Sequence, residues 1–143
     1  MRDLPSPDIS LKFTPSPTTL FRFSALTFNS HRIHLDRDYA RESEGYPGMA
    51  IPCDLRFLFV RSLGVPEITE RLVHGPLTAL MLLETLAYYY PEVQMKRFEY
   101  RALNPVVVNR ELTSYGSKSG LNEIVLWVQD EAGVVGMKGL VSL

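Results

Sequence analysis

The chain has 143 residues, of which 45% are hydrophobic and 22% are charged, and its formal net charge is -1. This length suits one globular domain, and scattered basic residues in a nearly neutral chain exclude nucleic acid as an expected partner. The only cysteine, Cys53, cannot form an internal disulfide, and no Cys/His cluster has zinc-site spacing, so we expect neither a metal nor another cofactor.

The N-terminal stretch MRDLPSPDIS lacks the apolar core of a secretion signal, and its aspartates argue against a mitochondrial transit peptide. We therefore expect an intracellular protein, and the cytoplasm is the favoured location. The longest strongly apolar stretch, residues 77–90, is too short to span a bilayer and contains Glu84. No membrane partner is expected.

The first part of the chain predicts an arm, a strand and a short helix, in that order. Residues 1–19 hold four prolines among Ser and Thr, which removes backbone donors and disfavours any regular element. The run LFRFSALTFN at residues 20–29 follows a period-two pattern, which predicts a strand buried on much of both faces. A short helix is expected from Asp36, before the Gly/Pro-rich residues 45–48.

The second half predicts a central helix followed by strands. Residues 77–90, LTALMLLETLAYYY, contain good helix formers, are apolar nearly all round and are bracketed by Pro76 and Pro91. Four strand candidates follow, separated by turn signals: residues 96–103, 106–115, 123–130 and 134–142. One buried helix, an antiparallel run of strands and an earlier strand predict an α+β fold, in which a curved antiparallel sheet wraps around the helix.

Four stretches carry a resemblance to a known family. They are FRFSALTFNSHRIHLDRDYARESEGYPG at residues 21–48, LVHGPL at 72–77, FEYRALNPVVV at 98–108 and the final VGMKGLVSL. This sequence resembles the MaoC-like hydratases and dehydratases, in the branch of hydroxyacyl-thioester dehydratase type 2 and mesaconyl-CoA hydratase. The resemblance implies a single hotdog domain over residues 20–143, similar to the C-terminal, active-site half of two-hotdog members. It also allows a mitochondrial location.

The resemblance implies a catalytic pair. The wider family carries D-x-N-P-x-H, and the register places His34 on its histidine and Asn29 on its aspartate. An imidazole exchanges protons near neutral pH, whereas a carboxamide only donates and accepts hydrogen bonds. We therefore expect His34 to transfer protons and Asn29 to orient water or a hydroxyl group.

The HGP sequence that precedes the predicted central helix implies an oxyanion site. The first N–H groups of a helix have no partner within the helix and lie at its positive end. By resemblance, the N–H of Gly75 would bind the thioester carbonyl oxygen, and glycine would allow a close approach. His74 and Tyr46 are weaker candidates for lining the acyl pocket.

These residues indicate a hydro-lyase that hydrates 2-enoyl thioesters or dehydrates 3-hydroxyacyl thioesters of coenzyme A or an acyl carrier protein. An isolated half of a two-hotdog architecture leaves a sheet edge to cover, so a homodimer is expected. One alternative is a hotdog thioesterase, disfavoured because Asn29 stands where a carboxylate would activate water. Another is a non-catalytic module for binding acyl thioesters or for dimerisation.

In the family that this sequence resembles, the EGYPG motif is followed almost directly by LVHGPL. Here the two motifs are separated by residues 49–71, MAIPCDLRFLFVRSLGVPEITER, which we interpret as an atypical insertion. It is a surface loop, a lid over the acyl site, or an intron translated through a gene-model error. Three nearby acids, Asp36, Asp38 and Glu44, are alternative sources of a catalytic carboxylate. Helix capping and the helix dipole explain the two aspartates without catalysis.

Overall fold

A computed structural model describes residues 4–43 and 70–143. Its five strands form one antiparallel sheet in the order β1-β3-β4-β5-β2. The strands are β1 (Ile9–Phe13), β2 (Arg97–Ala102), β3 (Leu112–Lys118), β4 (Glu123–Asp130) and β5 (Val135–Ser142). The helices are α1 (Pro17–Thr27), α2 (Arg32–Leu35), α3 (Arg37–Ser43) and α5 (Gly75–Tyr89).

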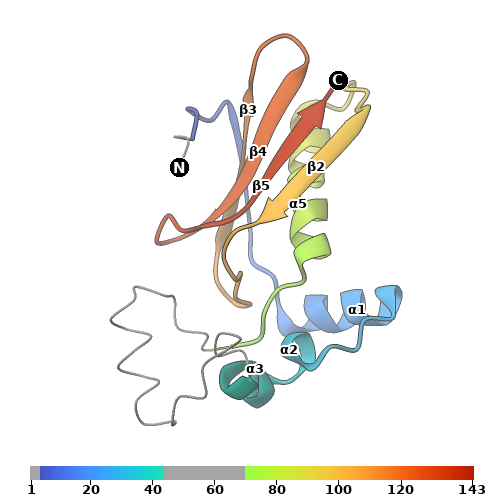
Figure 1. The fold of residues 1–143 in the computed structure, drawn as a ribbon, viewed down its shortest axis with the longest axis vertical. Helices are drawn as coiled ribbons and strands as arrows, with labels where there is room; N and C mark the ends of the chain where they lie inside the picture. The colour runs from blue at the N-terminus through green and yellow to red at the C-terminus, as the bar shows by residue number, and fades with distance from the viewer. Residues whose placement is uncertain (1–3, 44–69) are drawn as a thin grey trace.

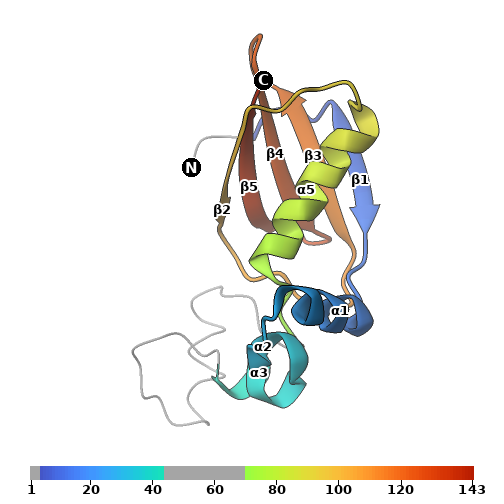
Figure 2. The same ribbon diagram turned by 90° about the vertical axis from the view of Figure 1, so that its right-hand side faces the viewer.

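The long helix α5 lies across one face of the curved sheet, as Figure 2 shows. Along β4, the buried residues Ile124, Leu126 and Val128 alternate with residues on the opposite face, so one side of the strand faces the helix. The core that results combines residues of α5 with residues of three strands: Ala79, Leu82, Leu86, Leu112, Ile124, Leu126, Val128, Met137 and Val141. This layout confirms the predicted α+β hotdog class.

The short helices lie apart from this core. In Figure 1, α1, α2 and α3 gather beyond one end of the sheet, next to the start of α5. A second cluster of buried residues, Leu20, Val73, Leu77 and Val108, joins α1 to the beginning of α5. The fold therefore places the residues 29–34 region beside the helix N-terminus. None of the described helices is both long and apolar enough to cross a membrane.

The predicted strand at residues 20–29 is wrong, because this stretch belongs to helix α1. Ser16 caps the helix: its side chain accepts from the backbone N–H of Thr19, the Thr19 side chain bonds back to the cap, and Pro17 occupies the first turn. The buried positions are Leu20 and Ser24, one helical turn apart. The helix-start signal at residues 16–19 therefore outweighs the period-two pattern.

The predicted arm at residues 1–19 also needs correction, because it contains strand β1 and the start of α1. Ile9 pairs with Gly116 and Phe13 with Leu112, which makes β1 an edge strand of the sheet. The prolines lie outside these five residues, so they remove no donor from the strand.

The strand expected at residues 106–115 starts later, at Leu112. Asn109 has a left-handed φ of 64°, which interrupts the extended chain, and its N–H donates to the carbonyl of Pro15 at 2.9 Å. Residues 106–108 instead pair with residues 71–73.

Most of the proposed insertion, residues 49–71, lies outside the described residues. Its last residue, Arg71, is bonded to the rest of the fold, since its carbonyl accepts the N–H of Val108 at 3.0 Å. The other expectations agree well: the short helix after Asp36 is α3, and the three remaining strand candidates correspond to β2, β4 and β5.

We predict that Leu82→Ala lowers the free energy of unfolding by about 2–5 kcal/mol, the range for a large-to-small change in a closed core. Leu82 is 0% exposed, whereas Leu80 in the same helix is 52% exposed. The control Leu80→Ala should change stability by only about 0.5 kcal/mol. Urea unfolding of both variants checks this, and equal losses would contradict the orientation of α5.

Candidate active site

The candidate site is organised by the extended residues 71–73, which lead into α5. On one side, the N–H of Val73 donates to the carbonyl of Val106 at 2.8 Å, and the Arg71 carbonyl accepts from Val108. On the other side, the N–H of Leu72 donates to the carbonyl of Ile33 at 3.0 Å. The segment thus holds α2 on one side and the approach to β3 on the other.

His34 is held by the same segment. Its Nδ1 lies 2.8 Å from the carbonyl oxygen of Leu72, and the side chain is only 8% exposed. A carbonyl can only accept, so Nδ1 carries the proton in this hydrogen bond and Nε2 is the basic nitrogen. In this tautomer, the unprotonated Nε2 is the nitrogen that can accept a proton.

His74 lies directly against His34. The two ring centroids are 3.6 Å apart with planes at 21°, so the imidazoles are stacked. His74 is 0% exposed, its Nε2 lies 2.8 Å from the Ser24 hydroxyl, and Phe23 meets the ring edge-on at 4.9 Å. Burial, and secondly the charge of His34, lower the pKa of His74 to about 4.

His74, a candidate for lining the acyl pocket, is completely buried, and that role stays a prediction. Ser24 was not predicted as a site residue, although it is 6% exposed and its hydroxyl contacts His74. The signal that was available is the helical spacing of Leu20 and Ser24, which the strand interpretation hid.

Gly75 is the first residue of α5, immediately after His74. A Cβ built on Gly75 would meet no described atom within 4 Å, so the space above its backbone is open. Pro76 has no N–H, which leaves Gly75 and Leu77 to supply the donors at this helix end. The opening can admit an anionic oxygen.

Asn29 lies just beyond the end of α1. Phe28 adopts a left-handed φ of 53°, and the N–H of Asn29 donates to the carbonyl of Ser24 at 2.9 Å. The Asn29 Oδ1 accepts the N–H of His31 at 3.1 Å, which orients the carboxamide. The structure thus brings His34, His74 and Gly75 together and connects Asn29 to them through Ser24.

Asn29 and Ser24 line an open, mainly apolar pocket of about 310 Å³ between α1 and α2. Phe28, at its rim, is 96% exposed. The seven lining residues are Phe21, Ser24, Ala25, Phe28, Asn29, Ser30 and Leu35. His34 and Gly75 do not line it, so this pocket lies beside the imidazole pair.

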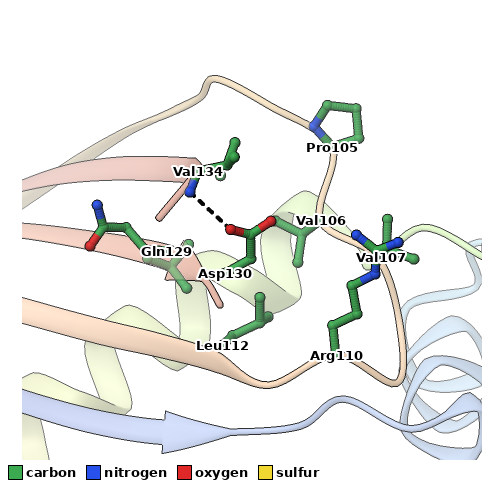
Figure 3. A pocket seen from close by; sticks show the side chains of 10 residues that line it. Pro105, Val106, Val107, Arg110, Leu112, Gln129, Asp130 and Val134 are labelled. Carbon is green, nitrogen blue, oxygen red and sulfur yellow. Dashed lines mark hydrogen bonds between the residues drawn. The ribbon is translucent and has the colours of Figure 1, made fainter. Parts of the chain in front are cut away.

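A second hollow lies at the turn between β4 and β5 and holds only about 10 Å³, room for roughly one water. Figure 3 shows Asp130 there, with its carboxylate accepting the N–H of Val134 at 2.9 Å. The same oxygen accepts the N–H of Ala132 at 3.0 Å. Asp130 therefore closes a turn and is not a candidate catalytic acid.

Among the alternative acids, Asp38 is exposed in the first turn of α3, whereas Asp36 has structural partners. Asp36 accepts the N–H of Tyr39 at 3.0 Å and pairs with Arg32 at 2.6 Å, and these hydrogen bonds lower the pKa of its carboxyl group. It caps α3 through the N–H of Tyr39. Glu44 and Tyr46 lie outside the described residues. Within residues 4–43 and 70–143, no group of three or more His, Cys, Asp or Glu side chains can hold a metal ion.

Comparisons with known proteins show the family of this chain. A family model described as hydroxyacyl-thioester dehydratase type 2 matches residues 2–63 and 64–108. The mitochondrial hydroxyacyl-thioester dehydratase type 2 of Schizosaccharomyces pombe is 36% identical over 122 residues, covering 84% of this chain and 33% of that protein. Mesaconyl-C(4)-CoA hydratase of Chloroflexus aurantiacus is 40% identical over 98 residues, covering 68% of this chain and 27% of the relative.

Solved structures agree on the fold. A MaoC-like dehydratase from Phytophthora capsici has a TM-score of 0.70 at 15% identity, over 99% of this chain and 42% of that one. R-hydratase PhaJ1 from Pseudomonas aeruginosa has a TM-score of 0.66 at 18% identity, over 96% of this chain and 79% of that one. The chain spans about a third or less of the length of both curated relatives. Because the family model matches well over half of its residues, this chain belongs to the hydroxyacyl-thioester dehydratase type 2 family.

Proposed function

We propose that this chain is a hydro-lyase that adds water to a 2-enoyl thioester and removes it from a 3-hydroxyacyl thioester. The observation that carries the proposal is the placement of His34. Its Nε2 is the basic nitrogen, and its ring stacks on His74, the residue before the first residue of α5. Family membership supports the reaction class. The acyl carrier is coenzyme A or an acyl carrier protein.

In the hydration direction, His34 accepts a proton from water while the water oxygen bonds to the β carbon. The electron pair of the double bond shifts toward the thioester oxygen and forms an enolate. His34 then returns its proton to the α carbon, which regenerates the neutral imidazole. Asn29 cannot exchange protons in this way, so its carboxamide orients the reacting oxygen.

The enolate oxygen needs a donor that is in place before charge develops. The N–H of Gly75 fills this role at the positive end of α5, and the open space above Gly75 leaves room for the thioester. The apolar pocket beside Asn29 suits part of an acyl chain. Tyr46 remains a candidate for lining the acyl site.

A second copy of the chain is the proposed protein partner. The sheet ends on one side at β2, most of whose residues are exposed. An edge strand leaves backbone donors and acceptors unpaired, and pairing with a second sheet satisfies them. The location in the cell remains a prediction: the sequence favours the cytoplasm, and the S. pombe relative is named as mitochondrial.

We predict that His34→Ala lowers the turnover number by about 100-fold to 10,000-fold, the usual contribution of a general acid-base group. Hydration of 2-enoyl-CoA substrates, followed by loss of double-bond absorbance, measures it. The exposed neighbour His31 provides the control His31→Ala, which should remain close to the parent protein. Near-normal turnover by His34→Ala on every accepted thioester would remove His34 from the mechanism.

Asn29→Asp should behave differently from the His34 variant. The carboxylate can still accept the N–H of His31, and it restores the acid expected at this position from the family resemblance. We expect partial or even raised hydration activity in the same assay. Loss as large as that of His34→Ala, with unchanged unfolding free energy, would show that the amide group itself is essential.

Gly75→Ala should separate folding from substrate binding. The added Cβ meets no described atom within 4 Å, so the unfolding midpoint should not fall. A thioester oxygen bound at the Gly75 N–H would meet the methyl group, so kcat/KM should drop, by about tenfold or more if even one oxyanion contact is weakened. Unchanged kcat/KM would place the oxyanion site elsewhere.

Light scattering tests the homodimer. At micromolar concentration we expect a molar mass near twice the 16.2 kDa of one chain. A monomer with full activity would show that no second copy is needed to complete the site.

A further inference from the structure

His74 is a buried polar residue that the proposed chemistry does not use. It occupies the cap position of α5, yet its side chain makes no capping hydrogen bond. Ser, Thr, Asp and Asn are the side chains that stabilise a helix start, and burial of a polar ring has a cost unless the ring is hydrogen-bonded. The helix therefore gives no reason for an imidazole at this place.

The contacts of His74 point toward His34 instead. The Nδ1 hydrogen bond to Leu72 fixes where the His34 ring points. The face of His74 lies against the plane of that ring, with centroids 3.6 Å apart, and limits how far the ring can tilt. His74 is itself fixed by the Ser24 hydroxyl at 2.8 Å and by the edge contact with Phe23.

We propose that His74 is a positioning residue: a neutral imidazole, anchored on the Ser24 hydroxyl, whose ring face keeps His34 aligned with the Leu72 carbonyl. The inference rests on the proposed function only for its effect on turnover. The alignment itself is a property of the unliganded protein.

The hydrogen-bond pattern indicates how His74 stays neutral. Its Nδ1 is buried and has no partner among the described residues. A bare acceptor nitrogen is less costly to bury than an unpaired N–H, so we assign the proton to Nε2, which donates to Ser24. Protonation of Nδ1 would create a buried cation stacked on His34, which is why the pKa of His74 is lowered to about 4.

Few titratable groups surround the pair in the described residues. His34 of α2 faces His74 directly, and the His31 ring lies 6.1 Å from His34. The α1 residues packed against His74, Phe23 and Ser24, carry no charge. A neutral His74 therefore leaves His34 able to gain a proton without a second cation stacked on it.

Two substitutions of similar volume separate ring stacking from simple filling of space. His74→Phe keeps a flat ring against His34, whereas His74→Leu fills the site without one. We expect kcat of the Phe variant to stay within about tenfold of the parent and that of the Leu variant to fall by about 100-fold, the effect of a small misplacement. KM should change little in either. Equal kcat values would overturn the proposal.

Nuclear magnetic resonance of the His34 ring tests the alignment without any turnover. The parent and His74→Phe should show a single Nδ1–H tautomer, while His74→Leu and Ser24→Ala should show a mixture. An unchanged tautomer in both of the latter overturns the inference, whatever the activity. If the parent protein hydrates no thioester, the proposed function fails, and this measurement alone decides the role of His74.

Stability against pH tests the neutrality of His74. Its pKa is about 4 in the folded protein and near 6.5 unfolded, so between these values the unfolded chain binds more protons. The stability that neutral His74 contributes is fully present above pH 6.5 and is lost as the pH falls toward 4. Between pH 7.5 and pH 5.0, the free energy of unfolding measured in urea should fall less for His74→Phe than for the parent protein. In the control His31→Asn it should fall as much as in the parent. Equal losses in the parent and His74→Phe would contradict a buried neutral ring.

Discussion

The backbone of residues 71–73 is the constraint on which the site depends. It is hydrogen-bonded to residues 106 and 108 on one side and to Ile33 on the other, and the carbonyl of Leu72 accepts from His34. The same residues lead directly into α5, so they fix the distance between His34 and the helix N-terminus. Main-chain hydrogen bonds, which need no particular side chain, therefore set the positions of the proposed catalytic groups.

Within that frame, packing determines how precisely the groups are held. The buried cluster of Leu20, Val73, Leu77 and Val108 attaches α1 to the start of α5. Ser24 lies on the same helix as Leu20, one turn later, and so it reaches His74. A change in the apolar cluster would move Ser24 as well. The polar contact is thus a consequence of apolar packing between α1 and α5.

The elements that could be predicted from sequence are those whose signals agree with one another. The helix α5 is apolar nearly all round and is bracketed by prolines, and β4 and β5 lie between clear turn residues. The stretch at residues 20–29 carries conflicting signals: a period-two pattern within it and a capping box before it. The proposal of His34 came from family resemblance and stays a prediction. Its stack with His74 joins residues 40 positions apart, which no local pattern encodes.

In the proposed mechanism, one side chain among the described residues, His34, transfers the protons. Asn29 cannot titrate, and burial keeps His74 neutral through the range in which an imidazole normally works. His31 is exposed, with its ring centroid 6.1 Å from that of His34. In that mechanism, His34 returns to the substrate the proton that it removes from water. The ring must therefore reach both the water and the α carbon without losing its orientation. A stacked, uncharged neighbour suits that requirement, because it restrains the ring without competing for the proton.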